Sequence, residues 1–445
     1  MSAINSYFCA LFSSMSQRKI DLLAASSIVV ANMIGTGVFT SLGYQLFGTP
    51  PGFPILAIWL VGGVLAFLGA LCYAELATRL PEDGGEYYFL SKIYHPALGF
   101  MAGFVSATVG FAAPIAMAAL ALGAYLKGIV PGLDEKLLAA AIVLGISTIH
   151  AVNFRAGISF QKVFTIVKVA IIVVFIGIGL SKGNVQHVQF NPGEWSWDKI
   201  VNVGFAVNLV WVSFAYSGWN ASAYIAGEII RPEKNLSRSI LWGTLIVTVL
   251  YVFLNAVFMM TTPADKMTGV KEVGLVASGY IFGENGGKIM GGIICVLLLS
   301  TISSMIIAGP RVIQPMFGKI SFLKPLAATD KSGNPVMSIG FQTVLALVLL
   351  YTIKFESLTY YIAFTLSMFT VLTVAGIIVL RIRDGKPEGY KAFGYPITPI
   401  LFIATTMGVA GFFMYKNTNE SLAGLLTILI GLVMYFFSDY RKTEK

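Results

Sequence analysis

The chain of 445 residues has a net charge of +9, and 56% of its residues are hydrophobic whereas only 11% are charged. A soluble domain carries about 25% charged residues. This composition, with a mean hydropathy of +0.80, excludes an ordinary soluble domain and indicates a polytopic membrane protein.

The N-terminal segment, residues 1–20, is expected to be a cytoplasmic tail. Residues 1–15 contain no basic residue, and the first long apolar run lacks the small-residue cleavage site of a signal peptide. We therefore expect no cleavable signal. The sequence leaves open whether translation starts at Met1 or at Met15.

The first apolar run, 22–74, holds no Asp, Glu, Lys or Arg. As a single helix it would be roughly 80 Å long, whereas a bilayer core is about 30 Å thick. It therefore predicts two spans hinged at 48–52. Ten further charge-free runs bring the expected number of spans to twelve: 93–126, 137–154, 169–181, 200–227, 239–264, 289–310, 332–353, 357–380, 392–415 and 421–438.

The loops between these runs differ in charge. Twenty of the 30 Lys and Arg residues fall in the tails and the loops of one side, nine lysines fall on the other side, and Lys168 lies within a span. The positive-inside rule then places both termini in the cytoplasm of a cell's plasma (inner) membrane. This bias accounts for the net charge without a nucleic-acid partner.

The spans form two similar halves. Residues 21–182 hold spans 1–5 and residues 200–382 hold spans 6–10, followed by spans 11 and 12 in 392–438 and a cytoplasmic tail, 439–445. Because five is odd, the second half enters the membrane from the opposite side, which predicts a 5+5 inverted repeat. The expected fold class is an all-α polytopic membrane protein of twelve transmembrane helices with broken helices 1 and 6.

The first predicted break lies at 32–37, Asn-Met-Ile-Gly-Thr-Gly. Gly35 and Gly37 carry no Cβ, so the backbone N–H groups around Thr36 could approach a solute closely. The half-helix that begins there would attract a carboxylate, and the half-helix that ends near Asn32 would leave carbonyls for an ammonium group. The alternative is a glycine notch for helix packing.

The second predicted break lies at 214–220, Phe-Ala-Tyr-Ser-Gly-Trp-Asn. Two interrupted helices at matching positions are the best sequence indication of a transporter's binding site. Phe214 is flat enough to cover a small solute, although ordinary packing is the alternative. Asn220 could contact the solute or the first break, or it could simply cap the half-helix that follows.

Four stretches carry a resemblance to a known family. They are Asn-Met-Ile-Gly-Thr-Gly-Val-Phe at 32–39, Tyr-Ala-Glu-Leu-Ala-Thr-Arg-Leu-Pro-Glu-Asp-Gly-Gly-Glu-Tyr at 73–87, His-Pro-Ala-Leu-Gly-Phe-Met-Ala-Gly at 95–103, and the second break with the segment that follows it to Asn235. The chain resembles the amino-acid–polyamine–organocation superfamily, close to its L-type amino-acid transporter branch and bacterial relatives.

The resemblance implies that substrate is held between spans 1 and 6. Gly35, Thr36 and Gly37 would bind the α-carboxylate, and the carbonyls of Met33 and Phe214 would bind the α-amino group. Phe214 would also be the aromatic gate, and Asn220 a polar contact beside the substrate. Ser217 stands where glycine is usual in this branch, so it would narrow the pocket against bulky substrates.

Lys168 is the one basic residue placed within a predicted span. A lysine at that depth is costly unless it is paired or hydrated, and the alternative is that it extends to the cytoplasmic surface near Lys162. The resemblance places its ammonium where sodium-coupled relatives hold sodium, within reach of the first break and of Ser300, Ser303 and Ser304 on span 8. Burial favours its neutral form and acceptors favour its charged form, so the sequence does not fix its protonation state.

Other polar residues are expected to be structural. Glu75, which could pair with Arg79, and Glu228 with Arg231 close their spans and suit a cytoplasmic gate. The histidines lack metal-ligand spacing, and no cofactor is expected. Cys9, Cys72 and Cys295 lie in the tail or in spans, so no disulfide-linked subunit is expected.

The function expected from these features is sodium-independent transport of neutral L-amino acids by exchange or facilitated diffusion. An enzyme is not expected, because the spans offer almost no acid–base groups. The alternatives are a proton-coupled symporter of amino acids and a polyamine or amine transporter. A dicationic substrate would require an acidic pocket residue, and Asn220 is neutral, which favours neutral amino acids.

Overall fold

The computed structural model describes residues 20–152, 154–195, 203–318, 320–321, 323–331 and 333–438, and the side chains of 154–162 and 203 are outside this description. Within these ranges the secondary structure is helical, and the one β pairing is an isolated parallel bridge between Ile20 and Ile229. The tail residues, including Met1, Met15 and Cys9, and the side chain of Lys162 lie outside the described residues.

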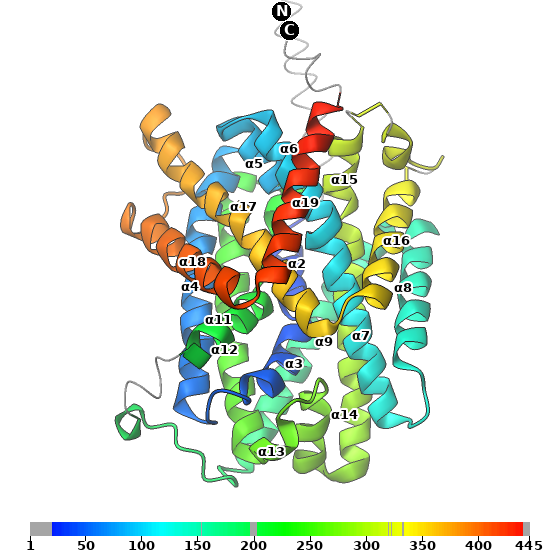
Figure 1. The fold of residues 1–445 in the computed structure, drawn as a ribbon, viewed down its shortest axis with the longest axis vertical. Coiled ribbons are helices and arrows are strands. Elements are labelled where there is room, and N and C mark those ends of the chain that lie inside the picture. Colours follow the sequence, from blue (N-terminus) through cyan, green and yellow to red (C-terminus); the bar gives the residue numbers. More distant parts are fainter. Residues whose placement is uncertain are drawn as a thin grey trace, which may run out of the picture.

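The helices follow one another along the described residues (Figure 1). Their bounds are α2 Leu22–Met33, α3 Thr36–Gln45, α4 Phe53–Arg79, α5 Glu86–Ile93, α6 Pro96–Val105, α7 Ala112–Ile129, α8 Glu135–Val152, α9 Phe154–Ser181, α11 Val203–Ala215, α12 Pro232–Thr261, α13 Ala264–Met267, α14 Val273–Ala308, α15 Pro310–Phe317, α16 Val336–Thr352, α17 Phe355–Arg383, α18 Ile397–Lys416 and α19 Thr418–Phe436. The described residues also form short helices of other types: η1 Ser106–Phe111, η2 Pro192–Glu194, η3 Ala221–Glu228 and η4 Lys324–Ala327.

The lengths of these helices suit a membrane. Ten helical segments among the described residues are long and apolar enough to cross a bilayer, and two further apolar helices, Gly204–Ala215 and Val336–Thr352, are shorter. The predicted all-α membrane fold is confirmed at this level. The count of twelve spans and the inverted repeat stay predictions.

The helices differ in how deeply they are buried. The segment α2–α3 is 83% buried whereas α19 is 22% buried. α2 and α3 lie in the interior, with α12 packed along α4 and α2, and α14 packed along α7 and α9. α18 and α19 lie on the outside against α17 (Figure 1). The buried segment near the N-terminus is therefore the centre of the bundle, which suits a predicted binding region.

Both predicted breaks are present. α2 ends at Met33 and α3 begins at Thr36, with Gly35 as an N-cap that has no side-chain hydrogen bond. α11 ends at Ala215, and the chain turns through 216–220 before η3, a 3₁₀ helix, begins at Ala221. Gly218 has a φ of +96°, a conformation that favours glycine, so this residue fixes the second turn.

One irregularity was not predicted from the sequence. Between α6 and α7 the chain forms a π-helix, η1, from Ser106 to Phe111. Pro114 follows three residues later within the continuous helical segment Pro96–Ile129, where it has no backbone N–H to donate. π-Helical turns are frequent at functional sites, and this one lies beside the cavity described next.

Candidate functional site

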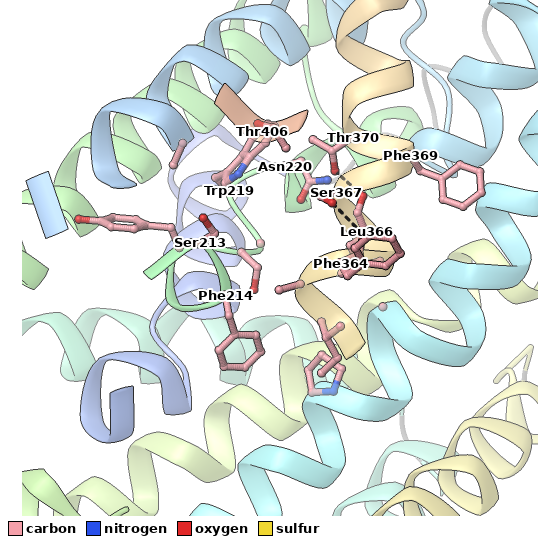
Figure 2. Close-up of a pocket in the computed structure, with 18 of the residues that line it drawn as sticks. Ser213, Phe214, Trp219, Asn220, Phe364, Leu366, Ser367, Phe369, Thr370 and Thr406 are labelled. Atoms are coloured by element: carbon pink, nitrogen blue, oxygen red, sulfur yellow. Dashed lines mark hydrogen bonds between the residues drawn. The ribbon is translucent and has the colours of Figure 1, made fainter. Parts of the chain in front are cut away.

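A cavity of about 180 Å³ lies next to the second break. It lies between α6–η1–α7, the segment α11–η3, α17 and α18. Figure 2 shows Phe214, Trp219 and Asn220 from the second break beside α17, whose labelled lining residues are Phe364, Leu366, Ser367, Phe369 and Thr370, with the Phe369 ring directed away from the break in this view. Its lining is mostly apolar, which is usual for a small-molecule site.

The two breaks lie directly against each other. A Cβ on Gly37 would lie 2.4 Å from the Cα of Ala215, and a Cβ on Gly218 would lie 3.0 Å from the backbone of Asn32. Tyr251 on α12 joins the breaks, because its hydroxyl donates to the carbonyls of Met33 and Ala215. Gly37 and Gly218 therefore allow the two backbones to pack against each other, because a Cβ at either position would lie too close to the other break.

The cavity touches only part of the predicted binding set. Its lining includes Phe214, Ser217 and Asn220 but not Met33, Gly35, Thr36 or Gly37, although Asn32 at the end of α2 lines it. The first break is covered because it packs on the second one in this conformation. The substrate-binding role of all seven residues stays a prediction.

The backbone groups of the breaks are partly engaged. The N–H of Gly35 donates to the carbonyl of Met33 at 2.8 Å, and the N–H of Ser217 donates to the carbonyl of Phe214 at 3.0 Å. α3 has no side-chain cap, so its first N–H groups, from Thr36 onward, have no intrahelical acceptor. The start of α3 therefore offers N–H groups without intrahelical acceptors, and their binding of a carboxylate stays a prediction.

Asn220 does not cap the helix that follows it, so the capping alternative is wrong. Its side-chain amide donates instead to Oε1 of Glu86, at 2.6 Å. The hydroxyl of Tyr73 donates to the same oxygen, at 2.8 Å. Asn220 therefore ties the second break to α4 and α5 while also lining the cavity.

Glu86 was missed as a site residue, although it belongs to the Gly-Gly-Glu-Tyr string quoted for the family resemblance. It is 4% exposed and lines the cavity. Gly84 and Gly85, with φ of +113° and +55°, turn the chain into α5 just before it. A glycine pair that turns an acidic residue inward was the available signal.

Lys168 is fully buried, so the alternative of an extension to the surface is wrong. Its Nζ donates to the carbonyl of Ile34 at 2.9 Å and to Oγ1 of Thr301 at 3.0 Å. Lys168 thus contacts the first break, as expected. The residue of α14 that contacts Lys168 is Thr301, which the sequence analysis did not name. The expected Ser303 and Ser304 bond elsewhere: Oγ of Ser303 lies 2.8 Å from Nε2 of His150, and the Ser304 hydroxyl donates to the Thr301 carbonyl.

At the end of the bundle that carries α5 and α15, which we call the α5 end, charged groups join the elements. Nε of Arg311 lies 2.7 Å from Oε1 of Glu228. Asp83 accepts from the N–H of Gly227 at 2.8 Å, and the N–H of Ile20 donates to the carbonyl of Glu228 at 3.0 Å. Burial raises the pKa of Asp83 to about 6, and the Gly227 hydrogen bond opposes this shift.

Glu75 lies fully buried near the same end. Its carboxylate accepts from Nε of Arg381 at 2.9 Å and from the N–H of Ala392 at 2.7 Å. The expected pairing with Arg79 is also present, with Nε of Arg79 3.7 Å from Oε1 of Glu75. Arg231, which was grouped with Glu228, is the left-handed N-cap of α12, and Glu228 pairs with Arg311 instead.

At the opposite end, which carries α13 and which we call the α13 end, aromatic rings join the elements. Tyr44 of α3 stacks on Trp211 of α11, with ring centroids 4.6 Å apart and planes 3° apart. Trp211 also meets Tyr360 of α17 edge-on at 5.5 Å. Asn208 donates to the carbonyl of Gln45 and to Oγ1 of Thr49.

Comparison with known proteins gives concordant matches over nearly the whole chain. The family model described as amino acid permease matches residues 20–436. The serine/threonine exchanger SteT of Bacillus subtilis is 30% identical over 436 residues, which is 96% of this chain and 98% of that protein.

Two mammalian proteins are similar as well. The b(0,+)-type amino acid transporter 1 of Mus musculus is 29% identical and covers 96% of this chain and 89% of that protein. The large neutral amino acids transporter small subunit 2 of Homo sapiens is 27% identical and covers 95% of this chain and 81% of that protein. These relatives are transporters rather than enzymes.

Proposed function

Because the chain belongs to the amino acid permease family, we propose that it is a sodium-independent secondary transporter of neutral L-amino acids that works by alternating access. Exchange is the proposed mode. The proposal includes twelve spans in a 5+5 inverted repeat, both termini in the cytoplasm, and residence in the plasma (inner) membrane.

The observation that carries this proposal is the meeting of two broken helices beside a small, mostly apolar cavity. Free backbone groups at membrane depth are tolerated only where protein or a water-filled space surrounds them. A zwitterion offers a carboxylate to the start of α3 and an ammonium to the carbonyls of the breaks. Similarity to an exchanger whose name specifies serine and threonine supports a small neutral substrate.

The proposed binding roles require the breaks to separate. The Met33 carbonyl is engaged by Tyr251 and by Gly35, and Gly37 lies on Ala215. A substrate would replace these contacts with its own α-amino and α-carboxylate groups. Phe214, which lines the cavity beside the breaks, would then cover the bound substrate as a gate.

Sodium independence rests on Lys168. Its ammonium donates to the first break at the Ile34 carbonyl and to Thr301, both of which are oxygen ligands of the kind a cation would need. A fixed positive charge at this position disfavours a second cation by Coulomb repulsion. The same lysine, if it released its proton during the cycle, would instead support proton-coupled symport.

The test is uptake of labelled serine into proteoliposomes that contain the purified chain. Replacement of sodium by choline should leave the rate within about twofold, which is ~0.4 kcal/mol in rate terms, and preloading with unlabelled serine should accelerate uptake. A large loss of rate in choline would contradict sodium independence. Absence of serine uptake under every condition would contradict amino-acid transport itself.

A second arm separates exchange from proton coupling. An inward proton gradient should not drive serine accumulation in the absence of internal amino acid. Accumulation that disappears in Lys168→Ala would instead establish the proton-coupled alternative. Polyamine or amine transport would appear as uptake of a labelled diamine that serine does not inhibit.

A further inference from the structure

Asn220 belongs to a hydrogen-bonded group that fixes its side-chain amide at the edge of the cavity. Its Nδ2 donates to Oε1 of Glu86 at 2.6 Å, and the hydroxyl of Tyr73 donates to the same oxygen at 2.8 Å. The hydroxyl of Tyr224 also bonds to the Glu86 carboxylate and lies 3.5 Å from Nδ2 of Asn220. Asn220, Glu86 and Tyr224 therefore form one closed group, and all three line the cavity.

The Glu86 carboxylate determines which way the Asn220 amide is turned. An ionised carboxylate only accepts hydrogen bonds, whereas an amide side chain has a donating NH₂ group and an accepting oxygen. The opposite orientation of the Asn220 amide would place two acceptor oxygens 2.6 Å apart. Glu86 therefore holds the NH₂ group, and the amide oxygen of Asn220, Oδ1, is left over.

Oδ1 of Asn220 has no hydrogen bond to any residue that the structure describes. Asn220 is only partly buried, so this oxygen can accept from a molecule in the cavity. The hydroxyls of Ser367 and Thr370, which also line the cavity, are already engaged because they donate to the carbonyls of Phe364 and Leu366 in their own helix. Oδ1 of Asn220 is thus an uncommitted acceptor in the lining.

The segment that carries Glu86 is held against η3. The N–H of Gly84 donates to the carbonyl of Tyr224 at 3.2 Å, and a Cβ on Gly85 would lie 2.5 Å from the Tyr224 ring. That ring also meets Phe111 of η1 edge-on, with centroids 5.4 Å apart. A binding atom is held in place when the groups behind it are themselves locked by packing and hydrogen bonds. The orientation of the Asn220 amide is therefore set without a ligand.

We infer that Glu86 is a positioning residue, which fixes the Asn220 amide so that its Oδ1 accepts a hydrogen bond from a donor on the substrate's side chain. This inference rests on the proposed function, which places the α-amino and α-carboxylate groups at the breaks. Phe214 and Asn220, at the two ends of the second break, both line the cavity. A side chain that extends from the breaks into the cavity therefore extends toward Asn220. Glu86 acts on the substrate only through that residue.

The test compares threonine with valine, which has nearly the same shape but carries a methyl group in place of the hydroxyl. Each amino acid competes against labelled serine in proteoliposomes, and the measured quantity is the ratio of the inhibition constant of valine to that of threonine. Wild type should give a ratio of about five, within the range expected for one hydrogen bond between neutral groups. The ratio cancels any change in uptake rate that is common to both competitors.

Glu86→Gln brings a second amide, which can donate to Oδ1 and let the Asn220 amide turn over. The ratio should then fall below about two, whereas Glu86→Asp, which keeps an acceptor-only group, should stay nearer to wild type. Asn220→Ala should also lower the ratio, and Glu86→Gln should add no further change in that background because it acts through Asn220. Glu420→Gln is the matched control, since Glu420 accepts from Ser357 and does not line the cavity, and it should keep the wild-type ratio.

A second pair of competitors separates a donor from an acceptor on the substrate. O-Methylserine and norvaline have side chains of equal length, but O-methylserine carries an ether oxygen, which accepts a hydrogen bond and cannot donate one. Wild type should not favour O-methylserine, because Asn220 presents an acceptor. Glu86→Gln should favour it, because the turned amide of Asn220 presents its NH₂ group. A merely structural role of Glu86 would not produce this reversal.

A wild-type ratio of valine to threonine near one would overturn the inference, as would a ratio that Glu86→Gln or Asn220→Ala leaves unchanged. A further fall of the ratio when Glu86→Gln is added to Asn220→Ala would overturn it too, since Glu86 would then act independently of Asn220. If Glu86→Gln does not fold, the wild-type ratio, Glu86→Asp and Asn220→Ala decide. If serine is not transported at all, the proposed function fails, and thermal stabilisation of the purified variants by threonine against valine still tests Glu86.

Discussion

The two ends of the bundle hold the broken helices by different chemistry. At the α5 end, the chain after the second break is held by an ion pair, Arg311 with Glu228, and by backbone groups that bond to Asp83 and Ile20. At the α13 end, the outer parts of α3 and α11 are held by the stack of Tyr44 on Trp211. The cavity lining includes none of the residues of either set.

The contacts at the two ends respond differently to salt and pH. Aromatic stacking depends on contact area and ring geometry and responds little to salt or pH. Ion pairs and a half-buried carboxyl respond to both. If the two ends open alternately, the α5 end is therefore the one whose opening solution conditions can regulate.

The two ends can be compared by weakening the contacts of each end in a separate variant and measuring access to the cavity with the same cysteine reporter. Ser217→Cys places a thiol in the cavity lining, and its modification rate by a soluble thiol reagent follows the open fraction. Cys72 and Cys295 are buried, and the parent chain without the Ser217→Cys change measures their background.

The largest effect is expected at the ion pair. Arg311→Met leaves the Glu228 carboxylate without its cation, and hydrogen bonds to charged groups contribute about 1.5–3 kcal/mol. The modification rate should rise by about 30-fold. The double variant Arg311→Met/Glu228→Gln should be less affected than the sum of the two single variants, because it leaves no charge unpaired.

If the double variant changed the free energy of opening, taken from the modification rate, by as much as the two single variants added together, Arg311 and Glu228 would not be coupled. In the protein that keeps the Arg311–Glu228 pair, raising the salt concentration from about 0.1 to 0.5 M should also raise the modification rate, by less than Arg311→Met does. The pair is partly exposed, so salt screens it.

A smaller effect is expected at the aromatic end. Trp211→Leu removes the stack on Tyr44 and the edge contact with Tyr360, at about 0.5–1.5 kcal/mol beyond the lost area. The modification rate should rise by about tenfold and should not depend on salt. Tyr415→Leu, at an exposed aromatic of α18, is the control and should change nothing. Salt dependence of the Trp211→Leu effect would contradict the assignment of stacking to this end.

The smallest effect is expected at Asp83. Its pKa is about 6 when it is buried against Gly227, with Glu228, Glu82 and Arg311 nearby, against an ordinary value of 3.8. The closed α5 end therefore binds the proton more tightly than the open one. Protonation stabilises the closed end below about pH 6, and this stabilisation is lost as the pH rises through 6.

The ratio of modification rates, wild type to Asp83→Asn, should rise about fourfold between pH 5.5 and 7.5. Both proteins carry the same thiol, so the ratio removes the pH dependence of the reagent. A flat ratio would mean that Asp83 keeps an ordinary pKa in the closed state.

Much of the architecture could be predicted because a bilayer imposes it. Charge-free runs, glycines in the middle of a helix and the distribution of Lys and Arg all reflect the cost of exposing polar groups to lipid. The breaks at Gly35 and Gly218 were found this way. α14 was underestimated, because Glu284 and Lys288, an exposed pair four residues apart, cut the apolar run although helix lies on both sides of them, with a kink at Gly283.

The site was predictable only in part. Lys168 was located from its position in an apolar run, but its contact with Thr301 depends on how α14 packs against α9. Glu86 was hidden because it sits near other charged residues at a predicted loop, where an acidic residue carries no signal. The glycine turn at 84–85 and the packing of α5 against α6 and α17 move it inward.

The sequence by itself determined that this is a helical membrane protein with two interrupted segments and a lysine at membrane depth, because local composition decides what a bilayer accepts. The tertiary structure decided that the two breaks lie on each other, that the cavity forms beside the second one, and that a buried carboxylate lines it. Those outcomes depend on contacts between segments up to a few hundred residues apart, as from Ile34 to Thr301. No local pattern of residue types encodes which of those segments will meet.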